Sequence, residues 1–177
     1  SKFDRECPSI NEVKTTTCWY PCNKGGSYRK WYGNRENVMD FSVSGQLEMK
    51  KQSGFRPVSL DDQFRPSISW SDVTSDRNSF RANGGHSLFE HAGSCAFIAD
   101  DNLLPLIAYL NSSAASVMLK MINPTLNCNA GVVSRLPLLG LGEEGRISSM
   151  AELAIELSKT DWDLLETSWD FKRSPLV

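Results

Sequence analysis

Apolar and polar positions alternate over short distances in the first hundred residues, a pattern that favours short β-strands over helices. Residues 38–43 and 46–50 flank the dipeptide Ser44-Gly45, which predicts a β-hairpin with a tight turn. Nothing between residues 51 and 99 keeps a helical period, and the apolar runs there are bounded by Gly, Asn, Asp and Ser. The further strand candidates are 67–70, 79–82 and 95–99.

A longer apolar run begins after residue 102 and has the length of a helix. Residues 100–102 offer side-chain oxygens for an N-cap, and residues 103–122 are apolar enough for one largely buried helix. The helix is expected to end before Asn123-Pro124, because the residue before a proline disfavours the helical conformation.

The C-terminal part changes from an extended to a helical pattern. Residues 131–139 predict a final strand or extended segment, and Pro137 places it at a sheet edge. Residues 147–158 have apolar positions at the spacing of an amphipathic helix. Thr160 with Asp163 three residues later resembles a capping box, which predicts a second, short helix.

These elements together predict an α+β fold with a short-stranded, mainly antiparallel sheet, one buried helix and a C-terminal helical segment. We expect an α+β domain over residues 1–142. Residues 143–177 would then be a helical segment that leads to a region outside the chain.

Composition is compatible with one packed unit. The chain has 177 residues, of which 40% are hydrophobic and 23% charged, so it can bury a core and is too balanced for disorder. No apolar run approaches the roughly 18–20 residues of a membrane span, and no signal peptide is recognisable. We therefore expect a soluble, cytoplasmic protein with no membrane partner. The start at Ser1 without Met suggests an excised fragment.

The five cysteines are an odd set with scattered spacing, which favours reduced thiols over a disulfide framework. A zinc site can be written from Cys18, Cys22, His86 and His91. The histidine spacing is wide and 63 residues separate Cys22 from His86, so we expect no metal site.

Charge is unevenly distributed along the chain. The net charge is −2, but residues 13–98 carry +3 and residues 143–177 carry −4. A basic N-terminal half with an acidic helical end is compatible with one DNA-facing surface and one surface that faces protein or solvent.

The most informative segment is Asn23 to Asn34, NKGGSYRKWYGN, with no carboxylate between Glu12 and Glu36. Its cations attract phosphate, its glycines let backbone N–H groups approach a ligand, and its aromatic rings offer flat faces. A solvated turn whose aromatics pack into the core would explain the same composition. Residue chemistry alone leaves both interpretations open.

Several motifs resemble a known family when taken in order. They are WYPCNKGGSYRKWYGN, RPSISWSDV from Arg65, SFRANGG, AYLNS, INPTLN with RLPL, and DWDLLETSWDFKRSPL. From about Cys18 onward they resemble PglX, the adenine-specific DNA methyltransferases of BREX phage-defence systems. The resemblance implies a target-recognition region.

The motifs that carry methyl transfer are absent. Adenine-N6 enzymes use an Asn/Asp-Pro-Pro-aromatic tetrapeptide, and here Asn123-Pro124-Thr125-Leu126 supplies only the first two positions. No glycine-rich turn suited to S-adenosylmethionine is present either. We therefore expect no catalytic residue and no cofactor in this chain. S-adenosylmethionine would serve the parent enzyme through a domain N-terminal to Ser1.

The resemblance implies that this region grips duplex DNA and works with the catalytic domain of the same chain, and it allows other defence proteins as partners. The DNA-contact candidates are Lys24, Gly25, Gly26, Ser27, Arg29, Lys30, Trp31, Asn34, Arg35, Arg65 and Arg81.

Two other functions are weighed against this one. The first is a protein-interaction module of the same assembly with little DNA affinity, which would use the acidic helical end and the tryptophans. The second is an independent enzyme or RNA binder, for which the chain offers no nucleophile–base pair and no RNA-binding signature. Trp70, Trp162 and Trp169 are expected in the core or against a neighbouring domain.

Overall fold

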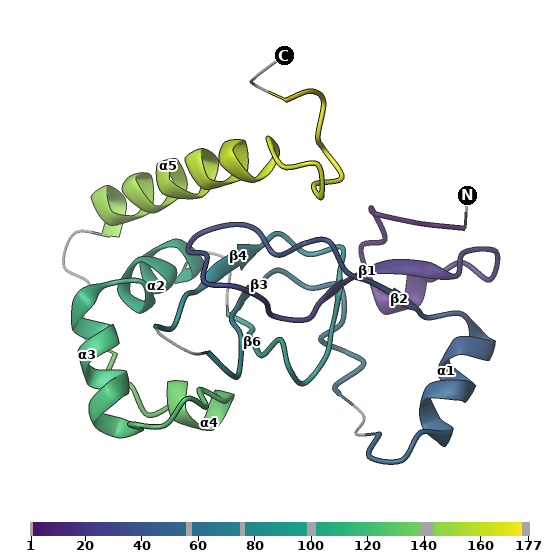
Figure 1. Ribbon diagram of the computed structural model, residues 1–177, viewed down its shortest axis with the longest axis horizontal. Coiled ribbons are helices and arrows are strands. Elements are labelled where there is room, and N and C mark those ends of the chain that lie inside the picture. Colours follow the sequence, from purple (N-terminus) through teal and green to yellow (C-terminus); the bar gives the residue numbers. More distant parts are fainter. Residues whose placement is uncertain (1, 56–57, 75–76, 99–101, 139–143, 175–177) are drawn as a thin grey trace.

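The computed structural model describes residues 2–55, 58–74, 77–98, 102–138 and 144–174, and it confirms the α+β class (Figure 1). Two small three-stranded sheets occupy the middle of the molecule. The first has the order β2-β1-β5 and the second β4-β3-β6. The first sheet comprises β1 (Trp19–Asn23), β2 (Val38–Asp40) and β5 (Leu88–Phe89), and the second comprises β3 (Ser67–Ser69), β4 (Arg81–Asn83) and β6 (Cys95–Ala96).

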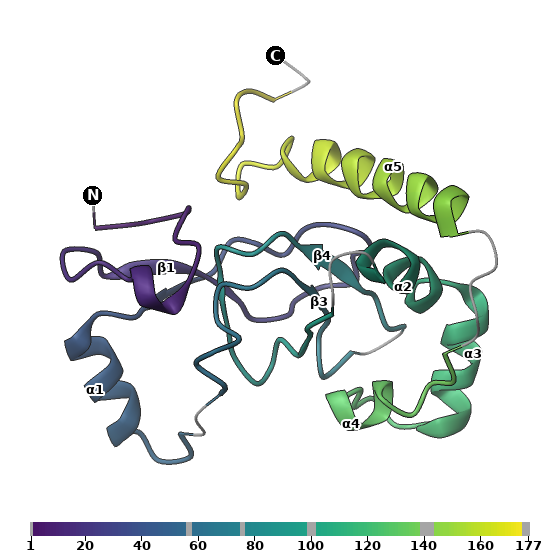
Figure 2. The ribbon, with the colours of Figure 1, turned by 180° about the vertical axis from the view of Figure 1, so that it is seen from behind.

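All strand pairs are antiparallel except β1 with β5, so the sheets are mainly antiparallel as predicted. The described helices are the 3-10 turn η1 (Ile10–Glu12), α1 (Val43–Lys51), α2 (Leu103–Leu110), α3 (Ser113–Ile122), α4 (Ala130–Val133) and α5 (Glu144–Trp162). Helix α1 lies at one end of the long axis and α3 with α4 at the other, while α5 lies across α2 (Figures 1 and 2).

Each sheet contributes to its own hydrophobic cluster. Tyr20 on β1 and Leu88 on β5 are fully buried, and Tyr20 meets Phe64 edge to face. The larger cluster joins the second sheet to α2, α3 and α5, and Trp70 and Ile107 are among its most buried members. The helices therefore pack around the second sheet.

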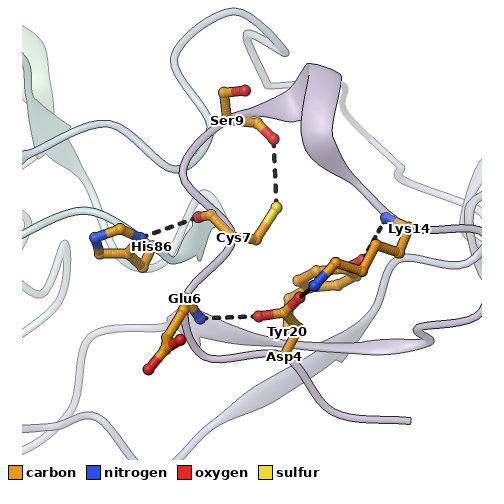
Figure 3. A network of polar contacts seen from close by, with 7 residues as sticks. All are labelled: Asp4, Glu6, Cys7, Ser9, Lys14, Tyr20 and His86. Carbon is orange, nitrogen blue, oxygen red and sulfur yellow. Dashed lines mark hydrogen bonds and ion pairs between the residues drawn. The ribbon is translucent and has the colours of Figure 1, made fainter. Parts of the chain in front are cut away.

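The N-terminal segment is fastened to the first sheet by a polar network (Figure 3). The Lys14 ammonium lies 2.9 Å from a carboxylate oxygen of Asp4, and this bond holds the pKa of Asp4 below its usual value. The Tyr20 hydroxyl accepts from the Lys14 backbone N–H at 3.2 Å. The same N-terminal segment contacts His86, whose Nδ1 lies 3.2 Å from the backbone oxygen of Cys7.

The predicted hairpin at residues 38–50 is wrong. Residues 38–40 do form a strand, but β2 pairs with β1, and residues 43–51 form helix α1. The Ser42 side chain accepts a hydrogen bond from the Gly45 backbone and caps this helix, so Ser44-Gly45 lies in the first turn of a helix. The strands at 67–70, 79–82 and 95–99 are present as β3, β4 and β6 with shifted ends, although residue 99 lies outside the described residues. The strands β1 and β5 are additional.

The predicted single helix over 103–122 is two helices bent by 67°. The break lies at Asn111 and Ser112, because the Ser112 hydroxyl accepts from the Ala115 backbone N–H and starts α3. Asn102 makes no side-chain cap, and residues 100 and 101 lie outside the described residues. The end before Asn123-Pro124 is confirmed.

The C-terminal predictions need two corrections. Residues 130–133 form helix α4, capped by Asn129, where a strand or extended segment was expected, and residue 139 lies outside the described part. The amphipathic helix is present as α5, but it continues through Thr160, whose hydroxyl donates to the Glu156 backbone oxygen. Thr160 therefore starts no second helix.

Within the described ranges, no single helix is long and apolar enough to cross a membrane; α2 and α3 would meet that length and composition only when joined across their bend.

Candidate nucleic-acid interface

The glycine-rich segment lies in residues 24–37, the connection between β1 and β2, which we call the basic loop. It leaves the first sheet, lies along the second, and returns. The Trp31 backbone N–H donates to the Phe80 oxygen at 2.9 Å, and the Trp31 oxygen accepts from the Ala82 N–H at 2.8 Å. The loop thus covers the outer edge of β4, which would otherwise expose unpaired backbone groups.

Two side chains set the shape of the glycine turn. The Ser71 hydroxyl bonds both the N–H and the oxygen of Gly26, each at 2.9 Å. The buried Asn34 adopts a positive φ of 55° and donates its side-chain amide to the Ser27 backbone oxygen at 2.9 Å. Gly25 has a φ of 83°, and a Cβ there would lie 2.8 Å from the Ala92 oxygen. These contacts fix the conformation of the glycine turn.

Arg81 lies beneath the loop and is only 1% exposed, so its side chain is in the interior of this structure. Its guanidinium donates to the Arg29 backbone oxygen at 3.4 Å and to the Ser79 oxygen at 3.4 Å. Burial lowers the pKa of Arg81 to about 10, which still leaves it a cation at neutral pH. Arg81 therefore supports the backbone of the basic loop.

Arg29 points toward helix α5. Its guanidinium lies 2.7 Å from a carboxylate oxygen of Asp161 and 5.1 Å from the centre of the Trp162 ring. Gly33 makes room for this contact, because a Cβ there would lie 2.2 Å from Cδ of Arg29. Arg29 is thus already paired within the protein.

Lys30 points toward the junction of α2 and α3. Its ammonium donates to the Asn111 backbone oxygen at 2.7 Å, where the negative end of the α2 dipole favours a cation. Arg35 donates to the Asn83 side chain at 3.3 Å and lies 5.6 Å from the centre of the Tyr32 ring. Both cations are partly covered by protein groups.

The exposed residues of the basic loop are Lys24, Gly26, Ser27 and Tyr28 at its start and Glu36 near its end. Tyr28 is 47% exposed and lies beneath the guanidinium of Arg77. Arg65, the remaining predicted contact, is half exposed and pairs with Asp62, so its contacts are outside the loop. The structure thus gathers most of the predicted residues on one loop but gives them different surroundings.

Sequence reasoning missed the residues that position the loop. Ser71 holds the glycine turn, and Asn111 bonds both backbone groups of Phe80, at 3.1 Å and 2.9 Å. The dipeptide Asn111-Ser112 carried a readable signal, since such residues favour helix ends and caps. Nothing local indicated Ser71.

Three tryptophans were expected in the core or against a neighbouring domain, and two of them lie in the core. Trp70 and Trp162 are buried, and Trp169 is half-buried with its ring edge-on to Phe3 at 5.5 Å. Trp31 is half-buried and packs against the larger cluster.

The cysteines are not arranged as metal ligands: among the residues the structure describes, no three His, Cys, Asp or Glu side chains are placed to hold an ion. Burial raises the pKa of Cys22 to about 12 and the pKa values of Cys95 and Cys128 to about 11, which keeps these thiols protonated.

Comparison with known proteins supports the resemblance seen in the motifs. The chain is 31% identical over 167 residues to the adenine-specific methyltransferase BrxX of Escherichia coli O9:H4 (strain HS), covering 93% of the chain and 13% of that protein. It is 32% identical over 176 residues to the adenine-specific methyltransferase PglX of Lacticaseibacillus casei (strain Zhang), covering 96% of the chain and 15% of that protein. No protein-family model matches. The chain thus spans about one-seventh of the length of these relatives, and the predicted resemblance is confirmed.

Proposed function

Because the chain is similar along almost its whole length to a segment of BREX adenine-specific methyltransferases, we propose that it is the DNA target-recognition portion of such an enzyme. It grips duplex DNA in the cytoplasm and orients it. A catalytic domain elsewhere in the parent polypeptide then transfers methyl from S-adenosylmethionine to adenine N6. This chain itself contributes binding and no chemistry.

One observation carries the proposal. The glycine turn is fixed by hydrogen bonds, and it exposes Lys24, Ser27 and Tyr28. A fixed turn presents these groups without a large ordering cost on binding. The Lys24 ammonium suits phosphate, and exposed hydroxyl groups suit phosphate oxygens or base edges.

The buried members of the predicted set have a supporting role in this proposal. Arg81 holds the Arg29 backbone from below, and Asn34 closes the turn onto Ser27. Trp31 fixes the loop to β4 through backbone bonds. These residues would position the contact groups and would not touch DNA themselves.

A salt-titrated binding measurement tests the proposal. We expect the 177-residue chain to bind a labelled duplex more tightly than single-stranded RNA, with an affinity that falls as salt rises. Lys24→Glu should weaken duplex binding and reduce the salt slope by about one, since it removes one phosphate contact and adds a negative charge.

Lys50→Glu is the matched control, because Lys50 is an exposed lysine on α1 at the end of the molecule away from α3. Equal effects of the two changes would indicate a general charge effect and not a contact. Absence of duplex binding by the unaltered chain would refute the proposal.

One observation favours the second candidate, a protein-interaction module. Met150, Leu153 and Leu157 are 65%, 55% and 63% exposed and recur along one face of α5. Such a stripe on a helix is typical of a contact with another helix or domain. If this is the main role, Leu153→Ser with Leu157→Ser should abolish assembly with the defence proteins, and the chain should show no duplex affinity.

A further inference from the structure

Two adjoining cavities run along α3 and form one groove, which we call the α3 groove. Their volumes are about 220 Å³ and about 330 Å³, and they share Asn78 and Ser116 in their walls. The first reaches Ser113 at the start of the helix, and the second reaches Asn123 just beyond its end. The groove therefore follows the whole length of α3.

The described residues that line the α3 groove carry positive charge. Lys30, Arg77 and Lys120 line it, and no described lining residue is an aspartate or a glutamate. Lys30 uses one ammonium hydrogen for the Asn111 oxygen, and an ammonium has three. Two donors of Lys30 can therefore serve an acceptor in the groove.

Hydroxyl groups and the helix start add to this charge. Ser112, Ser113 and Ser116 line the first cavity. The positive end of the α3 dipole lies at the same place, since α3 begins at Ser113. Serine hydroxyls and helix N–H groups both bind phosphate oxygens in proteins. The chemistry of the groove is therefore suited to a phosphate-bearing ligand.

An aromatic ring stands beside the cations. Tyr28 lines the first cavity, is 47% exposed, and has the Arg77 guanidinium 5.6 Å from its ring centre. A flat ring next to phosphate-binding groups offers a stacking face for a sugar or a base. This combination distinguishes nucleic acid from an inorganic anion.

The length of the groove points to a strand and not to a single phosphate. Helix α3 has 10 residues and is about 15 Å long at 1.5 Å per residue. One strand of a duplex places successive phosphates about 3.4 Å apart along the axis, so the groove spans several of them. We propose that the α3 groove binds the phosphodiester backbone of one DNA strand through Lys30, Ser113 and Lys120. The inference rests on the proposed function and names a surface for it.

Ser113→Glu tests the groove without endangering the fold. An acidic residue in the first helical turn is favoured by the dipole, so the thermal midpoint should stay the same or rise. The new carboxylate would nevertheless face the phosphates. We expect duplex affinity to fall on the order of tenfold at low salt. Lys120→Ala, as a second variant, should reduce the salt slope by about one.

Ser44→Glu is the matched control, because Ser44 is an exposed serine in the first turn of α1 and the change adds the same charge away from α3. If Ser113→Glu and Ser44→Glu bind the duplex equally, the groove assignment is refuted while the proposed function stands. If the unaltered chain binds no duplex, both are refuted.

A phosphate titration distinguishes a strand from a free anion. Inorganic phosphate is added to the isotopically labelled chain, and the amide signals at the start of α3 are followed. Strong phosphate shifts that Ser113→Glu abolishes, together with unchanged duplex affinity, would show a free-anion site and overturn the strand assignment. Weak shifts together with lost duplex affinity support it.

Discussion

Neighbouring cations of the basic loop point toward different helices, and the α5 side differs in charge from the α3 side. On the α5 side, Arg29 pairs with the Asp161 carboxylate at 2.7 Å, on a helix within a segment of net charge −4. On the α3 side, Lys30 bonds the neutral Asn111 oxygen at 2.7 Å and enters a groove with no described acidic lining residue. One loop therefore has a neutralised face and a cationic face.

This difference shows that charge counted along a sequence is not the charge presented to a ligand. Arg29 and Lys30 contribute equally to the basic segment, yet Asp161 offsets one of them. The cationic face is completed by Lys120, which is remote in sequence from the loop. We therefore expect DNA to favour the α3 side.

Gly33→Ala should cause the largest loss of stability, because it disrupts the contact between the basic loop and α5. Gly33 has a φ of 126°, and a Cβ would lie 2.2 Å from Cδ of Arg29 and 2.9 Å from Cε3 of Trp162. Backbone strain and overpacking together should lower the free energy of unfolding by about 2–4 kcal/mol. Urea denaturation measures the change.

Gly54→Ala separates strain from packing. Gly54 also has a positive φ, of 84°, but nothing lies within 4 Å of the position that a Cβ would take there. Only the strain of about 1–2 kcal/mol should remain in this variant. Equal losses in the two variants would show that the loop does not press against α5.

Asn111→Ala should disrupt the α3 side and lower the free energy of unfolding somewhat less than Gly33→Ala does. The change leaves the buried Phe80 N–H without its partner at 3.1 Å, while the Phe80 oxygen keeps its bond from the Trp31 N–H. One unpaired buried donor costs about 1–3 kcal/mol in unfolding free energy. The DNA affinity should change less than the stability, because Lys30 bonds the Asn111 backbone oxygen, which alanine retains.

Asn102→Ala, at the other end of α2, is the control. Asn102 is exposed and makes no side-chain cap bond, so its loss should stay within about 0.5 kcal/mol. If both asparagine changes cost the same, Asn111 does not organise the junction.

The two sides of the basic loop also show which features can be predicted from the sequence. The glycines and cations of the basic loop were recognisable from residue type, as was the amphipathic pattern of α5. The partner of Arg29 was not, because Asp161 lies 132 positions away and the pairing depends on tertiary packing. The burial of Arg81 was likewise hidden, since a charged residue on a strand is ordinarily exposed.

Local signals were available for two of the misread elements. Ser42 and Ser112 each accept a backbone N–H three residues later and start a helix. Both are serines in a favourable position for an N-cap, but a turn-forming dipeptide and a long apolar run in the same segments favour other structures. Strand register and the order of the two sheets depend on contacts between distant segments, which one sequence does not specify.

Removing the acid from the α5 side should shift the balance between the two faces. Asp161→Asn leaves Arg29 stacked near Trp162 without its carboxylate partner. A pair with one exposed partner is worth about 0.2–1 kcal/mol, so stability should change little. Duplex affinity should rise about two- to fivefold, because Arg29 becomes available to phosphate.

Glu152→Gln on the same helix changes the net charge equally and is not paired with the loop in any described contact. A rise of the same size in both variants would indicate general electrostatics and would remove the special role of Asp161.

The smallest effect concerns acid stability near the far end of the α5 side. The Arg5 guanidinium bonds Asp170 at 2.7 Å and holds the pKa of this carboxyl below its usual value. A carboxyl with a lowered pKa in the folded state stabilises the fold above its unfolded pKa of about 3.9, and this contribution disappears as pH falls through the folded value. Asp170→Asn should therefore lower stability at pH 7 and leave it unchanged near pH 2. Because the Asp170 side chain is 47% exposed, the difference should not exceed about 0.5 kcal/mol. Urea midpoints of the two proteins that stay separated by the same amount at both pH values would show that the Arg5 pair does not fasten this end of the molecule.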